Sequence, residues 1–187
     1  MSAPKRQLKM RRPDLLDLPA LVISDIVRSP GYALRTWLPG DEQAWADIMN
    51  TGIGEGWTVD LVREKFSTLP QFTPDAVFFA TRDGQPVGTA TAWRVPASET
   101  RQGYVHMVCV LPEHRGQNLG YLTTLATLHW FKQRGFSHAI LETDDFRLPA
   151  IKAYLRLGFA PAIEPGDDEM RQRWDRIMRA LSQTSSA

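Results

Sequence analysis

A turn rich in small residues separates an apolar segment from a long helical pattern near the middle of the chain. The apolar segment is Val108-Cys109-Val110, and the turn reads Arg115-Gly116-Gln117-Asn118-Leu119-Gly120. Amide groups in the first turn of a helix have no partner within the helix, and the helix dipole adds partial positive charge there. Gly116 and Gly120 let a ligand approach the backbone closely, and Arg115 adds a cation. The turn therefore predicts a diphosphate site, and an ordinary strand-to-helix turn is a comparable interpretation.

Four other side chains can donate or accept a proton. Tyr154 carries a phenol that stays protonated at neutral pH and can donate, although it could equally be a core aromatic. His106, two residues before Val108, titrates near neutrality as a general base should, yet a lone strand histidine is more often structural. Glu142 and Asp144 are rivals for this role, or they cap a helix or form salt bridges. The identity of the base stays open.

The elements that position these residues can be predicted from the periodicity of the apolar residues. The first half of the chain predicts a strand, two helices and an antiparallel meander, at residues 32–37, 41–49, 58–66, 76–81, 87–93 and 104–110. The second half alternates helix and strand, at residues 119–134, 139–143, 149–157, 159–163 and 168–181. This order indicates an α/β (α+β) fold with a mixed, mostly antiparallel sheet flanked by helices.

Residues 1–30 differ in charge and proline content from residues 31–187, which form the predicted domain. Five basic residues precede the first acidic residue of the chain: Lys5, Arg6, Lys9, Arg11 and Arg12. Four prolines interrupt regular structure. We interpret residues 1–30 as an extended, solvated arm packed loosely on the domain. An arm that grips a partner or an anionic ligand, and an Arg-rich organelle presequence, are the alternatives.

Composition excludes several classes of protein. The 187 residues, 43% of them hydrophobic, suit one domain, and a net charge of +1 creates no general attraction to nucleic acid or membranes. The single cysteine excludes a disulfide framework and a cysteine-rich zinc site. No apolar run approaches the roughly 20 residues that span a bilayer. We expect a cytoplasmic protein without a metal. The turn also lacks the Gly-Lys-Ser/Thr ending of a nucleotide P-loop.

Two motifs together resemble those of the GCN5-related N-acetyltransferase (GNAT) superfamily. They are Val110-Leu-Pro-Glu-His-Arg-Gly-Gln-Asn-Leu-Gly120 and Ala150-Ile-Lys-Ala-Tyr-Leu-Arg-Leu-Gly-Phe159, and the element order agrees over roughly residues 32–163. The resemblance implies splayed central strands and transfer of an acetyl group from acetyl-CoA to a primary amine by direct attack. It also implies a cofactor site made of Val108, Cys109, Val110, Arg115, Gly116, Gln117, Asn118, Leu119, Gly120 and Tyr121.

The resemblance implies roles for individual residues. Tyr154 matches the tyrosine that meets the thiol of departing coenzyme A. The Val110 amide would donate to the thioester carbonyl oxygen. The position of His106 resembles that of a histidine in the arylalkylamine branch, which acts through water. The acceptor would meet Glu55, Trp57 and Trp93, or these are a mobile loop and two core aromatics.

Three departures from the family pattern stand out. Asn118 replaces a glycine, and asparagine tolerates a left-handed conformation best among the other residues. Arg147 replaces an asparagine. A helix at residues 168–181 stands where a last strand is usual, and it could reshape the acceptor pocket or form a homodimer interface.

Two functions remain in competition. The first is an N-acetyltransferase acting on the amine of a small molecule or peptide. The second is a catalytically silent acyl-CoA sensor or interaction module, which Asn118, Arg147 and the unassigned base favour. Binding of nucleic acid through the basic N-terminus has little support.

Overall fold

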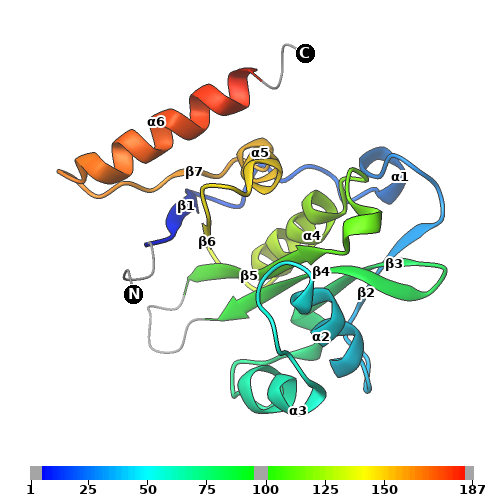
Figure 1. Cartoon of the computed structure of the whole chain (residues 1–187). Helices are drawn as coiled ribbons and strands as arrows, with labels where there is room; N and C mark the ends of the chain where they lie inside the picture. Colours follow the sequence, from blue (N-terminus) through cyan, green and yellow to red (C-terminus); the bar gives the residue numbers. More distant parts are fainter. Residues whose placement is uncertain (1–5, 95–100, 184–187) are drawn as a thin grey trace.

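The alternating segments form one mixed sheet in the order β2-β3-β4-β5-β6-β1-β7. The computed structural model describes residues 6–94 and 101–183 of the chain (Figure 1). Neighbouring strands run antiparallel except β5 and β6, which run parallel. The bounds are β1 Leu8–Arg12, β2 Tyr32–Thr36, β3 Val77–Arg82, β4 Gln85–Arg94, β5 Gln102–Val110, β6 His138–Thr143 and β7 Ala160–Pro161. The strand expected at residues 159–163 is thus reduced to two residues.

Helices cover both faces of the sheet (Figure 1). Their bounds are α1 Ile23–Ile26, α2 Glu42–Asn50, α3 Val59–Val62, α4 Leu119–Gln133, α5 Leu148–Arg156 and α6 Asp168–Gln183. A π turn at Arg63–Ser67 continues α3, and short 3-10 turns lie at Pro74–Ala76 and Pro112–His114. α4, α5 and α6 pack on one face, and α2 and α3 on the other. The C-terminal helix expected in place of a last strand is confirmed as α6.

The N-terminal segment differs from the loosely packed arm expected for it. Residues 8–12 form β1, which pairs with β6 on one side and β7 on the other. Leu8 and Met10 are fully buried, whereas Lys9 and Arg11 point to solvent. Arg12 is also buried, and its guanidinium donates to the carbonyl oxygens of Asp14, Asp17 and Leu157. The expectation was wrong because a strand of five residues, three of them basic, resembles a solvated segment. Lys5 lies outside the described residues.

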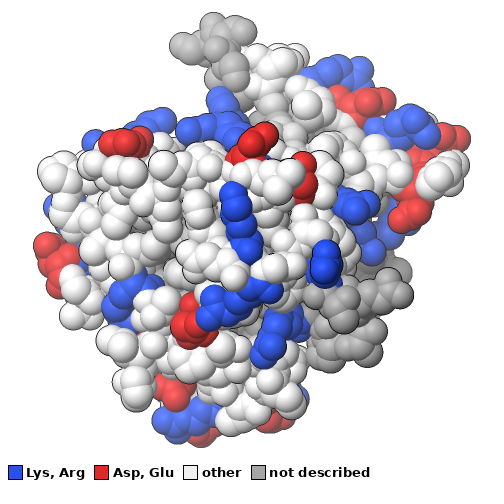
Figure 2. Space-filling view, turned by 180° about the vertical axis from the view of Figure 1, so that it is seen from behind, with Lys and Arg blue, Asp and Glu red and all other residues white. Residues whose placement is uncertain are grey.

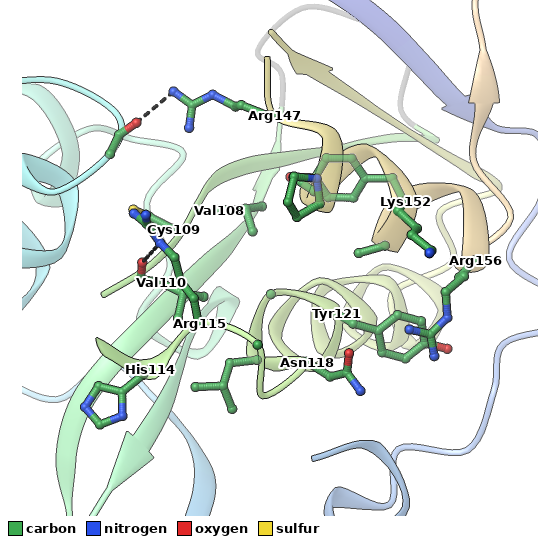
Figure 3. A pocket seen from close by; sticks show the side chains of 18 of the residues that line it. Val108, Cys109, Val110, His114, Arg115, Asn118, Tyr121, Arg147, Lys152 and Arg156 are labelled. Atoms are coloured by element: carbon green, nitrogen blue, oxygen red, sulfur yellow. Dashed lines mark hydrogen bonds between the residues drawn. The ribbon is translucent and has the colours of Figure 1, made fainter. Parts of the chain in front are cut away.

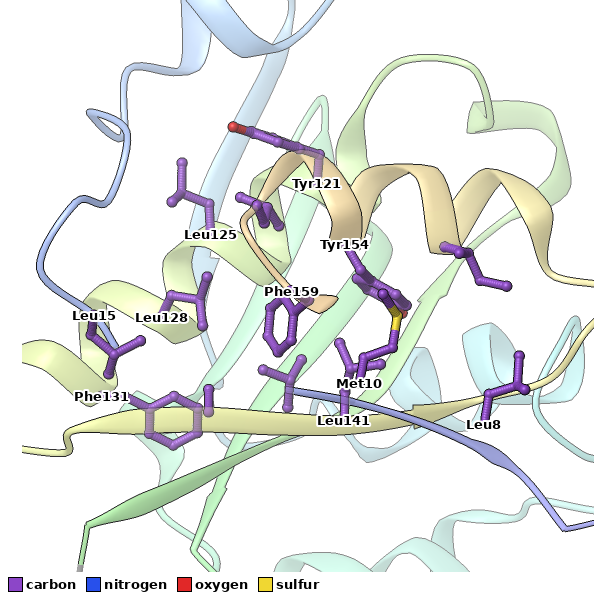
Figure 4. Close-up of a cluster of buried hydrophobic side chains, with 14 of the residues drawn as sticks. Leu8, Met10, Leu15, Tyr121, Leu125, Leu128, Phe131, Leu141, Tyr154 and Phe159 are labelled. Atoms are coloured by element: carbon purple, nitrogen blue, oxygen red, sulfur yellow. The ribbon is translucent and has the colours of Figure 1, made fainter. Parts of the chain in front are cut away.

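Two hydrophobic clusters lie on opposite faces of the sheet. The first joins β1, β6, α4, α5 and α6, and Tyr154 lies within it beside Met10 and Phe159 (Figure 4). The second lies under α2 and α3 and contains Trp45, Phe66 and Trp93. Side chains of β5 contribute to both clusters, Val105 to the first and Cys109 to the second.

The central strands separate, as the resemblance implied. β5 pairs with β6 only from Gln102–His138 to Tyr104–Ile140, and no pairing follows towards Val110. A bulge interrupts β5 on its other side, because Thr89 faces Cys109 whereas Thr91 faces His106. Met107, in the bulge, has a φ of 53°, a left-handed conformation that is uncommon for methionine. The bulge directs Val108 towards α5 and Cys109 towards α2.

The surface has no dominant charge on the face seen in Figure 2, where basic and acidic side chains are interspersed among uncharged ones. Within residues 6–94 and 101–183, no helix is long and apolar enough to cross a membrane. The same residues contain no group of three or more His, Cys, Asp or Glu side chains placed to hold a metal ion.

Candidate active site

A cavity of about 770 Å³ opens between the separated strands and the start of α4. Its walls are the end of β5, the turn before α4, the β6–α5 turn and one face of α5 (Figure 3). Of the ten residues expected to bind the cofactor, nine line this cavity: Val108, Cys109, Val110, Arg115, Gly116, Asn118, Leu119, Gly120 and Tyr121. Gln117 does not. Its buried Oε1 has no hydrogen-bond partner in the part of the chain that the structure describes.

The turn before α4 has the backbone geometry that an anion site needs. Gly116 has a φ of 79°, and Asn118 adopts the expected left-handed conformation with a φ of 61°. Asn118 is the N-cap of α4, and its carbonyl oxygen accepts from the Leu122 amide at 2.9 Å. Its Nδ2 donates to the carbonyl oxygen of Ile26 at 2.9 Å. The turn thus leaves the first amides of α4 facing the cavity and is fastened to α1.

The Arg115 side chain does not extend toward the first amides of α4, where the diphosphate is expected. Its Nε donates to the carbonyl oxygen of Val110 at 3.3 Å (Figure 3). An added Cβ on Gly52 would lie 3.7 Å from its Nη2. The Arg115 cation therefore lies at the inner end of the cavity, beside β5, rather than where we expect a diphosphate.

The backbone of β5 presents polar groups to the cavity. The Leu111 amide donates to the Val87 carbonyl oxygen on β4 at 2.9 Å. Since N–H directions alternate along a strand, the N–H and C=O of Val110 face the opposite side, where β6 has already diverged. The bond from Arg115 to the Val110 carbonyl oxygen agrees with this direction. An extended ligand can therefore pair with β5 here as a strand would.

Tyr154 faces both the core and the cavity. It is 5% exposed, belongs to the first hydrophobic cluster and also lines the cavity. Burial raises the pKa of its phenol above the usual value of about 10, and the positive charge of Arg147 opposes this shift only in part. The hydroxyl is therefore a neutral donor throughout the physiological pH range. The two alternative interpretations of this residue, core aromatic and proton donor, are compatible.

His106 and Glu142 do not line the cavity. The ring of His106 lies 5.7 Å from that of Trp93 and 5.0 Å from that of Tyr104. Burial lowers the pKa of His106 to about 4, so its imidazole is neutral at pH 7. Glu142 accepts a hydrogen bond from the Tyr104 hydroxyl at 3.4 Å and lies 3.8 Å from Lys9 Nζ.

Tyr104 is a residue that the sequence analysis did not identify. Burial raises the pKa of its phenol to about 12, and the neighbouring Glu142 carboxylate adds to the shift. The residue connects His106 with Glu142 across the gap between β5 and β6. Its place two residues before His106, on the same face of one strand, was the signal that could have revealed it.

The three expected acceptor residues are not gathered at the cavity. Trp93 is 9% exposed and stacks on Phe66 at 5.2 Å, so most of its surface belongs to the core. Trp57 packs edge-on against Trp45 at 5.1 Å, and Asn50 holds its backbone on both sides. Glu55 is exposed in the loop between α2 and α3. Of the three residues, only Glu55 is exposed.

Arg147 and the loop after α2 close the inner end of the cavity. Arg147 Nε donates to Asp144 Oδ2 at 2.9 Å, and its Nη2 donates to the carbonyl oxygen of Gly52 at 2.7 Å (Figure 3). Gly52 lies so close to β5 that an added Cβ would be 3.1 Å from Cys109 Sγ. The arginine in place of the usual asparagine thus joins two walls of the cavity.

Comparison with known families identifies this arrangement. A family model described as "Acetyltransferase (GNAT) family" matches residues 42–159. This chain therefore belongs to the GNAT acetyltransferase family.

Individual relatives agree with this assignment. The chain is 33% identical over 158 residues to a mycothiol acetyltransferase of Thermomonospora curvata, covering 81% of this chain and 50% of that protein. It is 34% identical over 162 residues to one of Streptomyces bingchenggensis, covering 82% and 51%. The chain thus spans about half the length of the curated relatives it matches. These relatives give no support to a catalytically silent module.

Solved structures confirm the fold. A GCN5-related N-acetyltransferase from Sphaerobacter thermophilus superposes with a TM-score of 0.66 at 20% identity, covering 83% of this chain and 48% of that one. A chain of the NatC complex bound to Gag peptide and CoA gives a TM-score of 0.60 at 16% identity, covering 71% and 86%. At these identities the likeness concerns the fold alone.

Proposed function

We propose that this chain is an acetyl-CoA-dependent N-acetyltransferase that acts on the primary amine of a small molecule. The observation that supports this most directly is the composition of the cavity. The turn before α4 forms one end, the edge of β5 that β6 leaves uncovered forms a wall, and Tyr154 lines the cavity with its phenol near Arg147 and Cys109. Five basic side chains and, among the described residues, no carboxylate line the cavity, which suits a polyanionic cofactor such as acetyl-CoA.

Each wall has a role in this proposal. The first amides of α4, with Gly116 and Gly120, hold the diphosphate. Val108 and Val110 bind the pantetheine arm through their backbone, and the Val110 amide donates to the thioester carbonyl oxygen. Bound acetyl-CoA supplies the activated acetyl group, and Tyr154 donates its proton to the departing sulfur.

We assign the acceptance of the amine proton to Glu142, acting through Tyr104 or water. His106 is the weaker candidate, because its half-buried ring packs against Trp93 and Tyr104. The Glu142 carboxylate is partly exposed and accepts from the Tyr104 hydroxyl. Replacement of Glu142 by Gln should lower kcat more than replacement of His106 by Gln. The opposite order would return the role to His106.

The acceptor is proposed from chemistry and from the relatives together. Glu55 and Glu142 offer negative charge to an ammonium group before it loses its proton. The name mycothiol acetyltransferase favours a small molecule over a peptide, so a peptide acceptor and a homodimer are secondary predictions.

Release of free thiol tests the function. The purified chain is incubated with acetyl-CoA and a panel of small amines, amino sugars and short peptides, and free thiol is measured with a chromogenic reagent. We expect amine-dependent thiol release that Tyr154→Phe strongly reduces. Binding of coenzyme A without thiol release for any amine would contradict the proposal.

A further inference from the structure

The outer part of the cavity carries more positive charge than a diphosphate requires. We propose that Arg28, Lys152 and Arg156 bind the 3′-phosphate of the coenzyme A ribose, so that the protein distinguishes coenzyme A from 3′-dephospho-coenzyme A. This inference rests on the proposed use of acetyl-CoA and assigns a further part of the same ligand.

The basic residues of the cavity fall into two groups. Arg115 and Arg147 lie at the inner end, near Gly52. Lys152 and Arg156 lie apart from them, beside the start of α4 (Figure 3), and Arg28 also lines the cavity. The chain as a whole has 22 basic and 21 acidic residues, so this segregation is local. A phosphate monoester carries between one and two negative charges at pH 7 and is the remaining anionic group of the cofactor.

Lys152 and Arg156 are placed to act on one group. They are four residues apart on α5 and therefore lie on the same face of the helix. Both side chains extend into the space beside the start of α4 (Figure 3). The Arg156 guanidinium lies 4.7 Å from the ring centre of Tyr121, the residue directly after the turn. This contact holds the cation over the first turn of α4.

Arg28 is brought to the same place from a distant part of the chain. The Asn118 side chain binds the Ile26 carbonyl oxygen, so the segment that follows α1 is fastened to the turn. Arg28 and Arg156 are exposed, and within residues 6–94 and 101–183 neither forms a salt bridge. Both guanidinium groups are therefore available to an incoming anion.

Calorimetric titration with coenzyme A and with 3′-dephospho-coenzyme A tests the inference. We expect the wild-type protein to bind coenzyme A about tenfold more tightly, the effect of one or more charge-assisted hydrogen bonds. Arg156→Gln and Arg28→Gln should each reduce this ratio, and the double variant, in which only Lys152 remains, should reduce it further. Because both residues are exposed, the unfolding temperature should not change.

A matched control removes the same charge elsewhere. Arg179 is exposed on α6 and outside the cavity, so Arg179→Gln should keep the wild-type ratio. Equal affinity of the wild-type protein for both ligands, with acetyl transfer intact, would overturn this inference alone. A parallel loss of affinity for both ligands in the variants would also overturn it, since general attraction to the diphosphate would then explain the cations. Failure to bind either ligand would overturn the proposed function as well.

Discussion

Arg147 binds the backbone of Gly52 across the inner end of the cavity, with Nη2 2.7 Å from the carbonyl oxygen. The same guanidinium binds Asp144, so one side chain joins the β6–α5 turn to the loop that carries Glu55 and Trp57. The first prediction concerns this bridge. Arg147→Ala should raise hydrogen exchange at the amides of residues 52–57 by roughly tenfold, because one charge-assisted hydrogen bond is lost. Arg147→Lys should restore little of this protection, since an ammonium group cannot reproduce the two separate donors with which the guanidinium binds Asp144 and Gly52.

Exchange measured by mass spectrometry checks this prediction. Arg171→Ala is the control, because Arg171 pairs with Asp168 on the exposed face of α6. Unchanged protection of residues 52–57 in the Arg147 variants would mean that the loop is held by Trp57 and Asn50 alone.

The second prediction concerns the left-handed residue in the turn. Asn118→Val should lower coenzyme A affinity and destabilise the protein by at least about 1–2 kcal/mol, since a β-branched residue is poorly accommodated at a φ of 61°. Asn118→Gly should preserve the turn but lose the bond to Ile26, which costs about 1 kcal/mol. Calorimetry and chemical denaturation measure both effects. If the Val variant binds coenzyme A normally, the turn is not the diphosphate site.

The third prediction concerns the pH dependence of the reaction. Because burial raises the pKa of Tyr154 above its usual value, the phenol remains protonated in alkaline solution, and kcat should show no alkaline decline up to pH 10. Tyr154→Phe should lower kcat by about 10²-fold at every pH. Steady-state rates from pH 6 to pH 10 check this, with Tyr32→Phe as the matched control. A decline near pH 9 that disappears in the Phe variant would contradict the raised pKa.

The fourth prediction concerns acid stability. The folded protein holds the pKa of His106 at about 4, against 6.5 for an unperturbed histidine. Between these values the unfolded chain binds a proton that the folded chain does not. The free energy of unfolding should therefore fall by up to about 3 kcal/mol as the pH drops from 6.5 to 4.

Urea denaturation at pH 4.5 and pH 7.5 measures this effect. His106→Gln should reduce the difference in unfolding free energy between the two pH values, because the variant lacks the imidazole that binds a proton on unfolding. The difference that remains is then due to carboxylates. An equal difference in wild-type and variant would show that His106 is reached by water in the folded state.

Local sequence signals were sufficient to predict elements whose apolar residues follow a regular period. The long apolar pattern after residue 119 predicted α4, and the left-handed preference of asparagine predicted the conformation of Asn118. The two motifs identified the family resemblance, and the resemblance in turn predicted the separated strands. The helical pattern of α4 and the conformation of Asn118 depend on neighbouring residues, which the sequence shows directly.

Pairing between strands that are distant in the sequence could not be predicted from such local signals. No local signal places Leu8 beside Thr143, or predicts that Met107 adopts a positive φ, because both depend on the surrounding sheet. The acceptor residues Trp57 and Trp93 were chosen by family analogy, and core packing decided their positions instead. Tyr104 was missed because its partner, Glu142, lies on another strand.

The position of β1 between β6 and β7 has a consequence for the order of folding. A newly made chain presents Leu8–Arg12 long before Thr143 and Pro161, its partners, have been synthesised. The half of the sheet that carries Glu142, and the helix of Tyr154 beside it, can therefore close only after most of the chain is present. Until then, β1 and β6 each expose hydrogen-bonding groups that another copy could pair with. Assembly of the residues proposed to transfer protons is thus a late event, and it depends on a strand contributed by the segment that looked least structured in the sequence.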